Sequence, residues 1–170
     1  MCVLKDIAVM YQNLTLDTDL FCTKLMNLQS QGNFDSFNLS SLFGLLQNKY
    51  PDINNINNDN YIYRVIFIYG RSNCIPHFKE GASKSQVQQL LDSPIFYFDG
   101  LYLHNKPNKD NKPQEIYDFI TELEGKDHSG YFFENSTSVR RLFLNVSNLL
   151  AHPLQRPEQS QFVCTLSAQE

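Results

Sequence analysis

The sequence predicts an α/β domain built on a mainly parallel sheet. Strand-like and helix-like segments alternate in the order strand, helix, helix, strand, helix, strand, helix, strand, helix, which favours helices on both faces of the sheet. Residues 65–69 are apolar on both faces and residues 95–104 are strongly apolar, a pattern typical of strands that are covered on both sides. A chain of 170 residues is long enough to bury one ordinary core.

The first third of the chain predicts a short strand and two helices. Residues 7–11 form the strand, which pairs through a tight turn with residues 2–4. Asp17 or Thr18 caps a helix that ends near residue 28, and Asn38 caps the next helix. Each helix has an apolar face, with Leu20, Phe21, Leu25 and Leu28 in the first and Leu39, Leu42, Phe43 and Leu46 in the second.

The remaining elements keep the alternating order. The Asn- and Asp-rich residues 51–60 predict a surface loop, and residues 61–70 predict a strand that ends at Gly70. A weaker helix follows at about 85–92, then the strand at 95–104 and a polar loop at 105–111.

The last three elements are two helices with a short strand between them. Pro113 begins a helix whose buried side carries Ile116, Phe119, Ile120 and Leu123. Residues 131–133 form the strand. Ser136 caps the final helix, and Pro153 ends it. One face of that helix carries Val139, Leu142, Phe143, Val146, Leu149 and Leu150.

Asp99 departs from the apolar pattern of its strand. A buried carboxylate needs a partner. The simplest explanation is that Asp99 faces a helix end or marks the start of a strand bend at Gly100.

Motifs for nucleotide or hydrolase chemistry are absent from the sequence. It contains no GxGxxG, GxxxxGK[ST] or GxSxG segment. Arg71 is better explained as a surface arginine than as a phosphate ligand, and no histidine or carboxylate is placed to activate Ser72. Cys74 and His77 would supply two of the four ligands that a structural zinc needs. We therefore predict no catalytic residue, no metal site and no cofactor.

Composition and charge argue against other classes of protein. The net charge is −4 and no basic face is visible, so a nucleic-acid partner is not expected. No apolar run reaches the roughly 18 residues that span a membrane, and residues 1–6 lack the features of a signal peptide. The four cysteines form no CxxC pair, which fits reduced thiols in an intracellular protein.

The residues after the last helix differ from the rest. Residues 153–161 contain two prolines, three glutamines and one isolated aliphatic residue, Leu154, so they cannot form a core of their own. We divide the chain into an incomplete domain at 1–152 and a tail at 153–170. The residues alone leave open a tail without function and a tail that binds a partner. Three features favour binding. The prolines reduce the conformational entropy that the tail loses when it becomes ordered on a partner, Leu154 offers an apolar contact, and Arg156 can make a bidentate contact through its guanidinium.

Several segments resemble one known family. They are residues 64–69, 94–99, 102–105, the pair of short runs at 37–39 and 42–43, and above all the nine residues 149–157, LLAHPLQRP. Nearly the whole chain is similar, in the same order, to the von Willebrand A-like scaffold subunits of the BRISC and BRCA-A deubiquitinase complexes. The resemblance implies a Rossmann-like, three-layer von Willebrand A-like sandwich that lacks its first strand and helix.

The resemblance also implies a non-catalytic function. The family's scaffold stabilises a JAMM-type zinc isopeptidase that cuts lysine-sixty-three-linked ubiquitin chains, in the DNA-damage response and in cytoplasmic signalling. The implied direct partner is a subunit built from ubiquitin-conjugating-variant domains. The isopeptidase and its pseudo-enzyme scaffold are indirect partners. The partner-binding residues carried over are Pro153, Leu154, Gln155, Arg156 and Pro157, and the implied localisation is cytoplasm and nucleus.

Two departures from the family pattern matter. Metal-binding von Willebrand A domains carry DxSxS and a later Asp-Gly, whereas this chain lacks DxSxS and has Gly70-Arg71-Ser72 at the later position. We predict no adhesion-type metal site. The alternatives are a metal-dependent ligand-binding von Willebrand A module, or a small α/β hydrolase or nucleotide enzyme that uses residues 70–74. The family's first strand and helix have no counterpart, as in a truncated gene model, which would leave strand 61–70 as an open edge.

Overall fold

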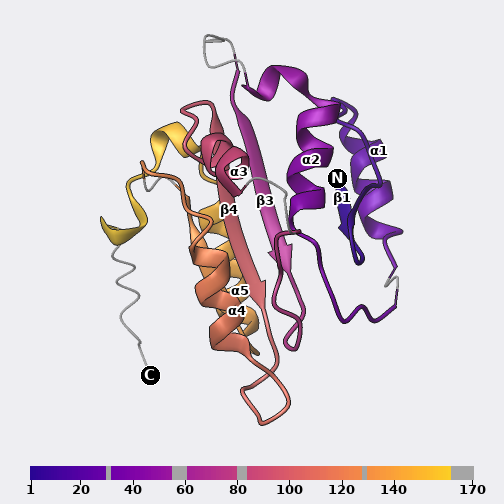
Figure 1. The fold of residues 1–170 in the computed structure, drawn as a ribbon, viewed down its shortest axis with the longest axis vertical. Helices are drawn as coiled ribbons and strands as arrows, with labels where there is room; N and C mark the ends of the chain where they lie inside the picture. The colour runs from indigo at the N-terminus through magenta and orange to yellow at the C-terminus, as the bar shows by residue number, and fades with distance from the viewer. Residues whose placement is uncertain (30–31, 55–60, 80–83, 128–129, 162–170) are drawn as a thin grey trace.

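Three parallel strands form the sheet of this α/β fold. The computed structural model describes residues 1–29, 32–54, 61–79, 84–127 and 130–161 (Figure 1). The strands are β3 (Tyr63–Tyr69), β4 (Phe96–Leu103) and β5 (Phe132–Asn135), and both neighbouring pairs are parallel, with β4 in the middle. The predicted α/β class and parallel sheet are thus confirmed, and the arrangement is compatible with a Rossmann-like fold.

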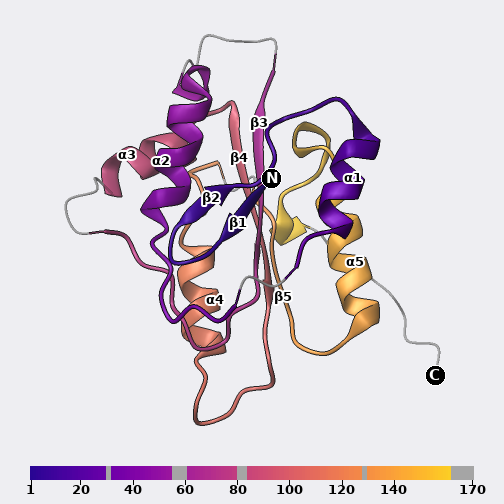
Figure 2. The ribbon, with the colours of Figure 1, turned by 90° about the vertical axis from the view of Figure 1, so that its right-hand side faces the viewer.

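Helices cover both faces of the sheet. One face carries α2 (Ser40–Lys49), α3 (Lys84–Leu91) and α4 (Pro113–Thr121), and the opposite face carries α5 (Val139–Leu150) (Figure 2). A further helix, α1 (Thr18–Met26), lies on the α5 side. Three short 3-10 turns complete the described elements, at Pro51–Asn54, Pro153–Gln155 and Gln159–Gln161.

The N-terminal hairpin is confirmed. Strands β1 (Cys2–Leu4) and β2 (Ala8–Met10) pair in antiparallel fashion. The backbone N–H of Ala8 donates to Ser41 Oγ at 2.7 Å, which ties the hairpin to the first turn of α2.

The helix caps agree with the sequence at one place and differ at two. Asp17 Oδ1 accepts from the backbone N–H of Leu20 at 2.8 Å, so Asp17 caps α1 as predicted. The prediction that Asn38 caps the next helix is wrong, because Leu39 is the N-cap of α2. Asn38 lies one residue earlier, where its Oδ1 accepts from the backbone N–H of Ser40 at 3.1 Å. The prediction that Ser136 caps the final helix is wrong. Strand β5 continues to residue 135 and a bend follows, so α5 begins later and Ser138 is its cap.

The larger core lies between the sheet and helices α2, α3 and α4. It is rich in aromatic rings, and among its buried members are Phe37, Phe43, Phe67, Tyr69, Phe98, Tyr102 and Phe132. A smaller core, made by Leu101, Tyr131 and Leu149, lies on the α5 side. The two faces of the sheet are therefore buried to different extents.

Strand β3 corrects one expectation from the sequence. The side chains of Phe67 and Tyr69 are buried, but Ile66 is 43% exposed and Ile68 is 55% exposed. The prediction of cover on both faces therefore holds for β4 and is wrong for β3. The reason is position, because β4 lies between two strands whereas β3 is the outer strand of the described sheet.

Helix α1 also keeps its apolar face in solvent. None of its residues is buried, and Leu20, Phe21 and Leu25 are 39%, 40% and 49% exposed. These side chains, together with Ile66 and Ile68, are therefore apolar positions that stay accessible to solvent.

Candidate partner-binding site at the C-terminal tail

Asp99 anchors a buried charged cluster in the middle of the sheet. Its side chain is completely buried. Arg64 Nε donates to Oδ2 at 2.7 Å, Arg156 donates to both carboxylate oxygens, and the backbone N–H of Tyr131 donates to Oδ1 at 2.8 Å. The expectation that Asp99 faces a helix end or a strand bend is wrong. Its charged partners are two arginines, Arg64 and Arg156. We call the group formed by Asp99, these two arginines and Tyr131 the Asp99 cluster.

Arg64 links the cluster to the end of α5. Besides Asp99, its guanidinium donates to the backbone carbonyls of Leu149 and Ala151. The last carbonyls of a helix have no partners within the helix, so Arg64 satisfies two of these acceptors while it neutralises Asp99. The C-terminus of α5 is thereby fixed over β3 and β4.

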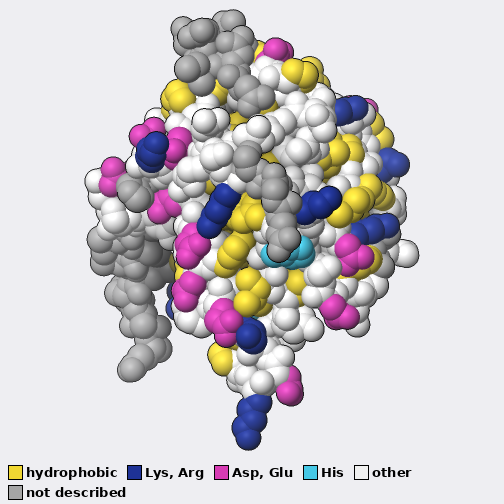
Figure 3. All heavy atoms as spheres, viewed as in Figure 1, with side chains coloured by type: hydrophobic (Ala, Val, Ile, Leu, Met, Phe, Trp, Pro, Cys, Tyr) yellow, Lys and Arg dark blue, Asp and Glu magenta, His cyan; other side chains and the backbone are white. Residues whose placement is uncertain are grey.

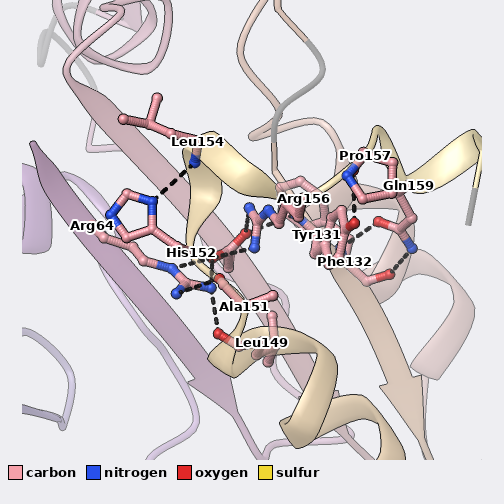
Figure 4. A network of polar contacts seen from close by, with 11 residues as sticks. Arg64, Tyr131, Phe132, Leu149, Ala151, His152, Leu154, Arg156, Pro157 and Gln159 are labelled. Atoms are coloured by element: carbon pink, nitrogen blue, oxygen red, sulfur yellow. Dashed lines mark hydrogen bonds and ion pairs between the residues drawn. The ribbon is translucent and has the colours of Figure 1, made fainter.

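Arg156 fixes the tail to the same carboxylate. Its side chain is 2% exposed, and its guanidinium lies 4.0 Å from the centre of the Tyr131 ring. A desolvated cation over an aromatic face is stabilised further by the charge distribution of the ring. The sequence suggested that Arg156 makes a bidentate contact with a partner. In the structure, Arg156 makes a bidentate contact within this chain (Figure 4).

Two further contacts hold the tail beyond Arg156. Tyr131 Oη donates to the carbonyl of Pro157 at 2.7 Å, and burial raises the pKa of this hydroxyl, which keeps its proton available. The side-chain amide of Gln159 donates to the carbonyl of Phe132 and accepts from its N–H, both at 2.7 Å. Gln159 therefore satisfies backbone groups of β5 as a neighbouring strand would.

The five predicted partner-binding residues lie in different surroundings. Pro153 is buried, the side chain of Arg156 is enclosed, and Leu154, Gln155 and Pro157 face solvent. Leu154 is 64% exposed. Its backbone N–H donates to His152 Nδ1 at 3.3 Å, and the turn closes when Gln155 N donates to the carbonyl of His152 at 2.9 Å. Partner binding by these residues stays a prediction.

The loop at the carboxyl end of β3 is occupied by structural contacts. Arg71 donates to the carbonyls of Ser36, Leu4 and Lys5 at 2.7–2.8 Å. Ser72 Oγ accepts from the backbone N–H of Asn105 at 2.9 Å. A hollow of about 550 Å³ lies beside them, lined largely by asparagine and aspartate side chains. Arg71 is therefore engaged in holding the N-terminal segments to β3.

Side chains that could bind a metal ion do not gather within the described residues. In these ranges, no group of three or more His, Cys, Asp and Glu side chains could hold a metal ion. No helix in the same ranges is both long and apolar enough to cross a membrane. On the face shown in Figure 3, cationic and anionic side chains are interspersed rather than gathered by sign.

The fold and the tail together define an α/β domain with a parallel sheet whose C-terminal extension is fixed to its own strands by a buried ion pair. No family model matches the chain. Proteins named BRISC and BRCA1-A complex member 1 match nearly all of it. The Xenopus laevis protein is 32% identical over 170 residues, which cover 96% of this chain and 50% of that protein. The human protein is 29% identical over 176 residues, covering 99% and 52%.

The mouse protein of the same name is 31% identical over 167 residues, which cover 93% of this chain and 49% of that protein. The resemblance drawn from the sequence is therefore confirmed, and the chain is a homologue of the BRISC and BRCA1-A complex member 1 family. It spans about half the length of the curated relatives it matches. The names describe these relatives as members of complexes and not as enzymes.

Proposed function

We propose that the chain is a non-catalytic scaffold subunit of a deubiquitinase complex of the BRISC or BRCA1-A type. The observation that carries this proposal is the homology, over nearly the whole chain, to proteins named as members of those complexes. The resemblance adds the finer function. The subunit would stabilise a JAMM-type isopeptidase that acts on lysine-sixty-three-linked ubiquitin chains, in the cytoplasm and the nucleus.

The proposed direct partner is the subunit built from ubiquitin-conjugating-variant domains, and the proposed contact is the tail at 153–161. Leu154 supports this choice because its aliphatic side chain is exposed, whereas the side chains of Pro153 before it and Arg156 two residues after it are buried. The isopeptidase and its pseudo-enzyme scaffold would be reached through that partner. The proposed fold is von Willebrand A-like, with β3 as the strand whose outer edge accepts the family's first strand.

Leu154→Asp tests the binding function directly. The purified chain would be mixed with the purified ubiquitin-conjugating-variant-domain subunit, and complex formation would be followed by size-exclusion chromatography and calorimetry. We expect affinity to fall by at least about tenfold, because a charge would enter an apolar contact. Val139→Asp is the matched control, since Val139 is also 64% exposed but lies at the start of α5.

Unchanged affinity of Leu154→Asp would contradict binding through the tail. Arg156→Glu is unsuited to this test. A glutamate there would set a second carboxylate against the buried Asp99, so lost binding would report a disturbed fold.

A further inference from the structure

We infer that Gln159, together with Tyr117 and Asn145, closes the outer edge of β5 against the addition of a further strand. An open strand edge is a template for pairing with another chain. The tail therefore protects the folded protein from self-association through β5. This role concerns the chain alone and does not depend on the proposed binding function.

The backbone groups of β5 alternate between two directions. The carbonyl of Tyr131 accepts from the N–H of Gly100 on β4 at 2.8 Å, so the groups of Tyr131 face inward. Phe132, the next residue, directs its N–H and carbonyl to the outer edge, and so does Glu134 two residues further along. Within the described residues, no strand pairs with this edge.

Side chains occupy these outward-facing groups instead. Gln159 accepts from the N–H of Phe132 and donates to its carbonyl, both at 2.7 Å (Figure 4). Tyr117 Oη, on α4, donates to the same carbonyl at 3.0 Å. Asn145 Nδ2, on α5, donates to the carbonyl of Glu134 at 3.3 Å. Helices from both faces of the sheet and the tail thus converge on one edge.

A side chain ends the sheet, whereas a paired strand would extend it. A strand that paired with β5 would satisfy Phe132 and then present an outer edge of its own. The tail does not form such a strand, because Pro157 has no N–H to donate and Gln159–Gln161 forms a 3-10 turn. The amide of Gln159 makes both hydrogen bonds of a neighbouring strand and adds no new edge.

The sequence of β5 explains why its edge needs protection. Residues 131–133 are three successive aromatic residues, with neither a charge nor a proline, and aromatic residues favour strands. Segments of this kind associate when their backbone is accessible. Glu124 and Glu158 line a hollow beside Gln159 and Phe132. These two carboxylates add charge beside the edge, which also disfavours strand addition.

Hydrogen exchange of Gln159→Ala in the full chain tests whether Gln159 covers the edge. Exchange at the amide of Phe132 should become at least about tenfold faster, because its acceptor is lost. Exchange at the amide of Tyr131, which donates to Asp99 at 2.8 Å, should stay unchanged. Gln155→Ala is the matched control, since Gln155 is an exposed glutamine of the same tail, and it should change neither amide.

Two results of this measurement would overturn the inference. Unchanged exchange at Phe132 would show that Gln159 does not cover the edge. Equal acceleration at Phe132 and Tyr131 would show that Gln159 holds the whole segment in place rather than its edge.

Sedimentation velocity over a concentration series tests the consequence. Self-association of Gln159→Ala should begin at a concentration at least about tenfold lower than that of Gln155→Ala. The β3 edge is the same in both variants, so the difference between them reports on β5. Gln159→Glu keeps an acceptor for the Phe132 N–H and adds a charge at the edge, so it should associate no more than the wild type.

Faster exchange at Phe132 without stronger association of Gln159→Ala would overturn the protective role. Association of Gln159→Glu as strong as that of Gln159→Ala would also overturn it, because neither an acceptor nor a charge at the edge would then matter.

Discussion

At the scale of single residues, the Asp99 cluster shows how the chain accommodates a charge inside an apolar strand. The carboxylate receives donors from β3, from the start of β5 and from the tail. Removing one member of a buried ion pair costs about 3–5 kcal/mol in typical proteins. The cluster therefore stabilises the fold only while all three segments are in place.

Sequence reasoning identified Asp99 as unusual but not its partners. Arg64 and Arg156 lie 35 and 57 residues away along the chain. Periodicity reports which face of a strand a residue occupies. It does not report which distant side chain meets it, because that depends on how the tail returns to the sheet. The only available signal was the presence of a carboxylate in a run that otherwise buries apolar side chains.

Gly125 gives a prediction at this scale. A Cβ atom built on Gly125 would lie 2.2 Å from the backbone carbonyl oxygen of Leu91, which cannot rotate away. We expect Gly125→Ala to lower the free energy of unfolding by about 1–3 kcal/mol, measured by urea denaturation. Gly44→Ala is the control. That position in α2 has nothing within 4 Å, and alanine there should raise stability by about 0.5–1 kcal/mol. If Gly125→Ala left the free energy of unfolding unchanged, the chain around residue 125 could move away from the end of α3 without loss of stability.

At the scale of elements, most strands and helices could be predicted because their apolar residues follow the period of the element. The hairpin, α2, β3, β4, α4 and α5 appear where the pattern places them. Burial was harder to predict. The same apolar pattern describes β4, which has neighbours on both sides, and β3, which is outermost in the described sheet. Helix α1 has a regular apolar face and still buries none of it.

The outer edge of β3 leads to a second prediction. Ile66 and Ile68 are exposed, and the outer edge of β3 pairs with no other strand of the described residues, which favours association between chains. We expect Ile68→Lys to reduce concentration-dependent self-association, measured by sedimentation velocity. The free energy of unfolding should stay within about 0.5 kcal/mol, because the side chain is 55% exposed. Leu14→Lys, at a 72% exposed position outside the strands, should leave association unchanged. Equal effects of the two lysines would point to general charge rather than the β3 edge.

At the scale of the whole molecule, buried tyrosines make stability depend on alkaline pH. Burial raises the pKa of Tyr102 to about 12, and burial also raises the pKa of Tyr69, which donates to the carbonyl of Cys74 at 2.7 Å. In the unfolded chain these hydroxyls ionise near pH 10. Each folded-state pKa lies above its unfolded value, so the contribution is fully present below about pH 10 and is lost as pH rises toward about 12.

The measurement is a series of urea denaturation curves between neutral pH and pH 11, together with tyrosinate absorbance at 295 nm. We expect the unfolding midpoint to fall above about pH 10, with part of the absorbance change appearing only on unfolding. Tyr69→Phe should lower stability at neutral pH through the lost hydrogen bond and make the alkaline decrease shallower. An unchanged slope in that variant would assign the pH dependence to other groups.

The tail was the least predictable part at this scale. Its prolines and glutamines predicted a segment without a core of its own, and residues 153–161 indeed borrow their partners from β4 and β5. Which of its residues would face inward did not follow from composition. Arginine is common both in interfaces and in buried ion pairs, and the sequence offers no means to separate these roles.

The closing of the β5 edge by Gln159 has a practical consequence for protein engineering. A recombinant version that stops after the last long helix would leave the Phe132 amide without its acceptor and Asp99 with one of its two cations. Such a product would differ from the native molecule in solubility as well as in its missing peptide. If this deletion abolished binding to a partner, the result would not show whether the tail contacts the partner or only stabilises the domain. A single substitution of the exposed Leu154 leaves the contacts of Asp99 and Gln159 in place and avoids this ambiguity.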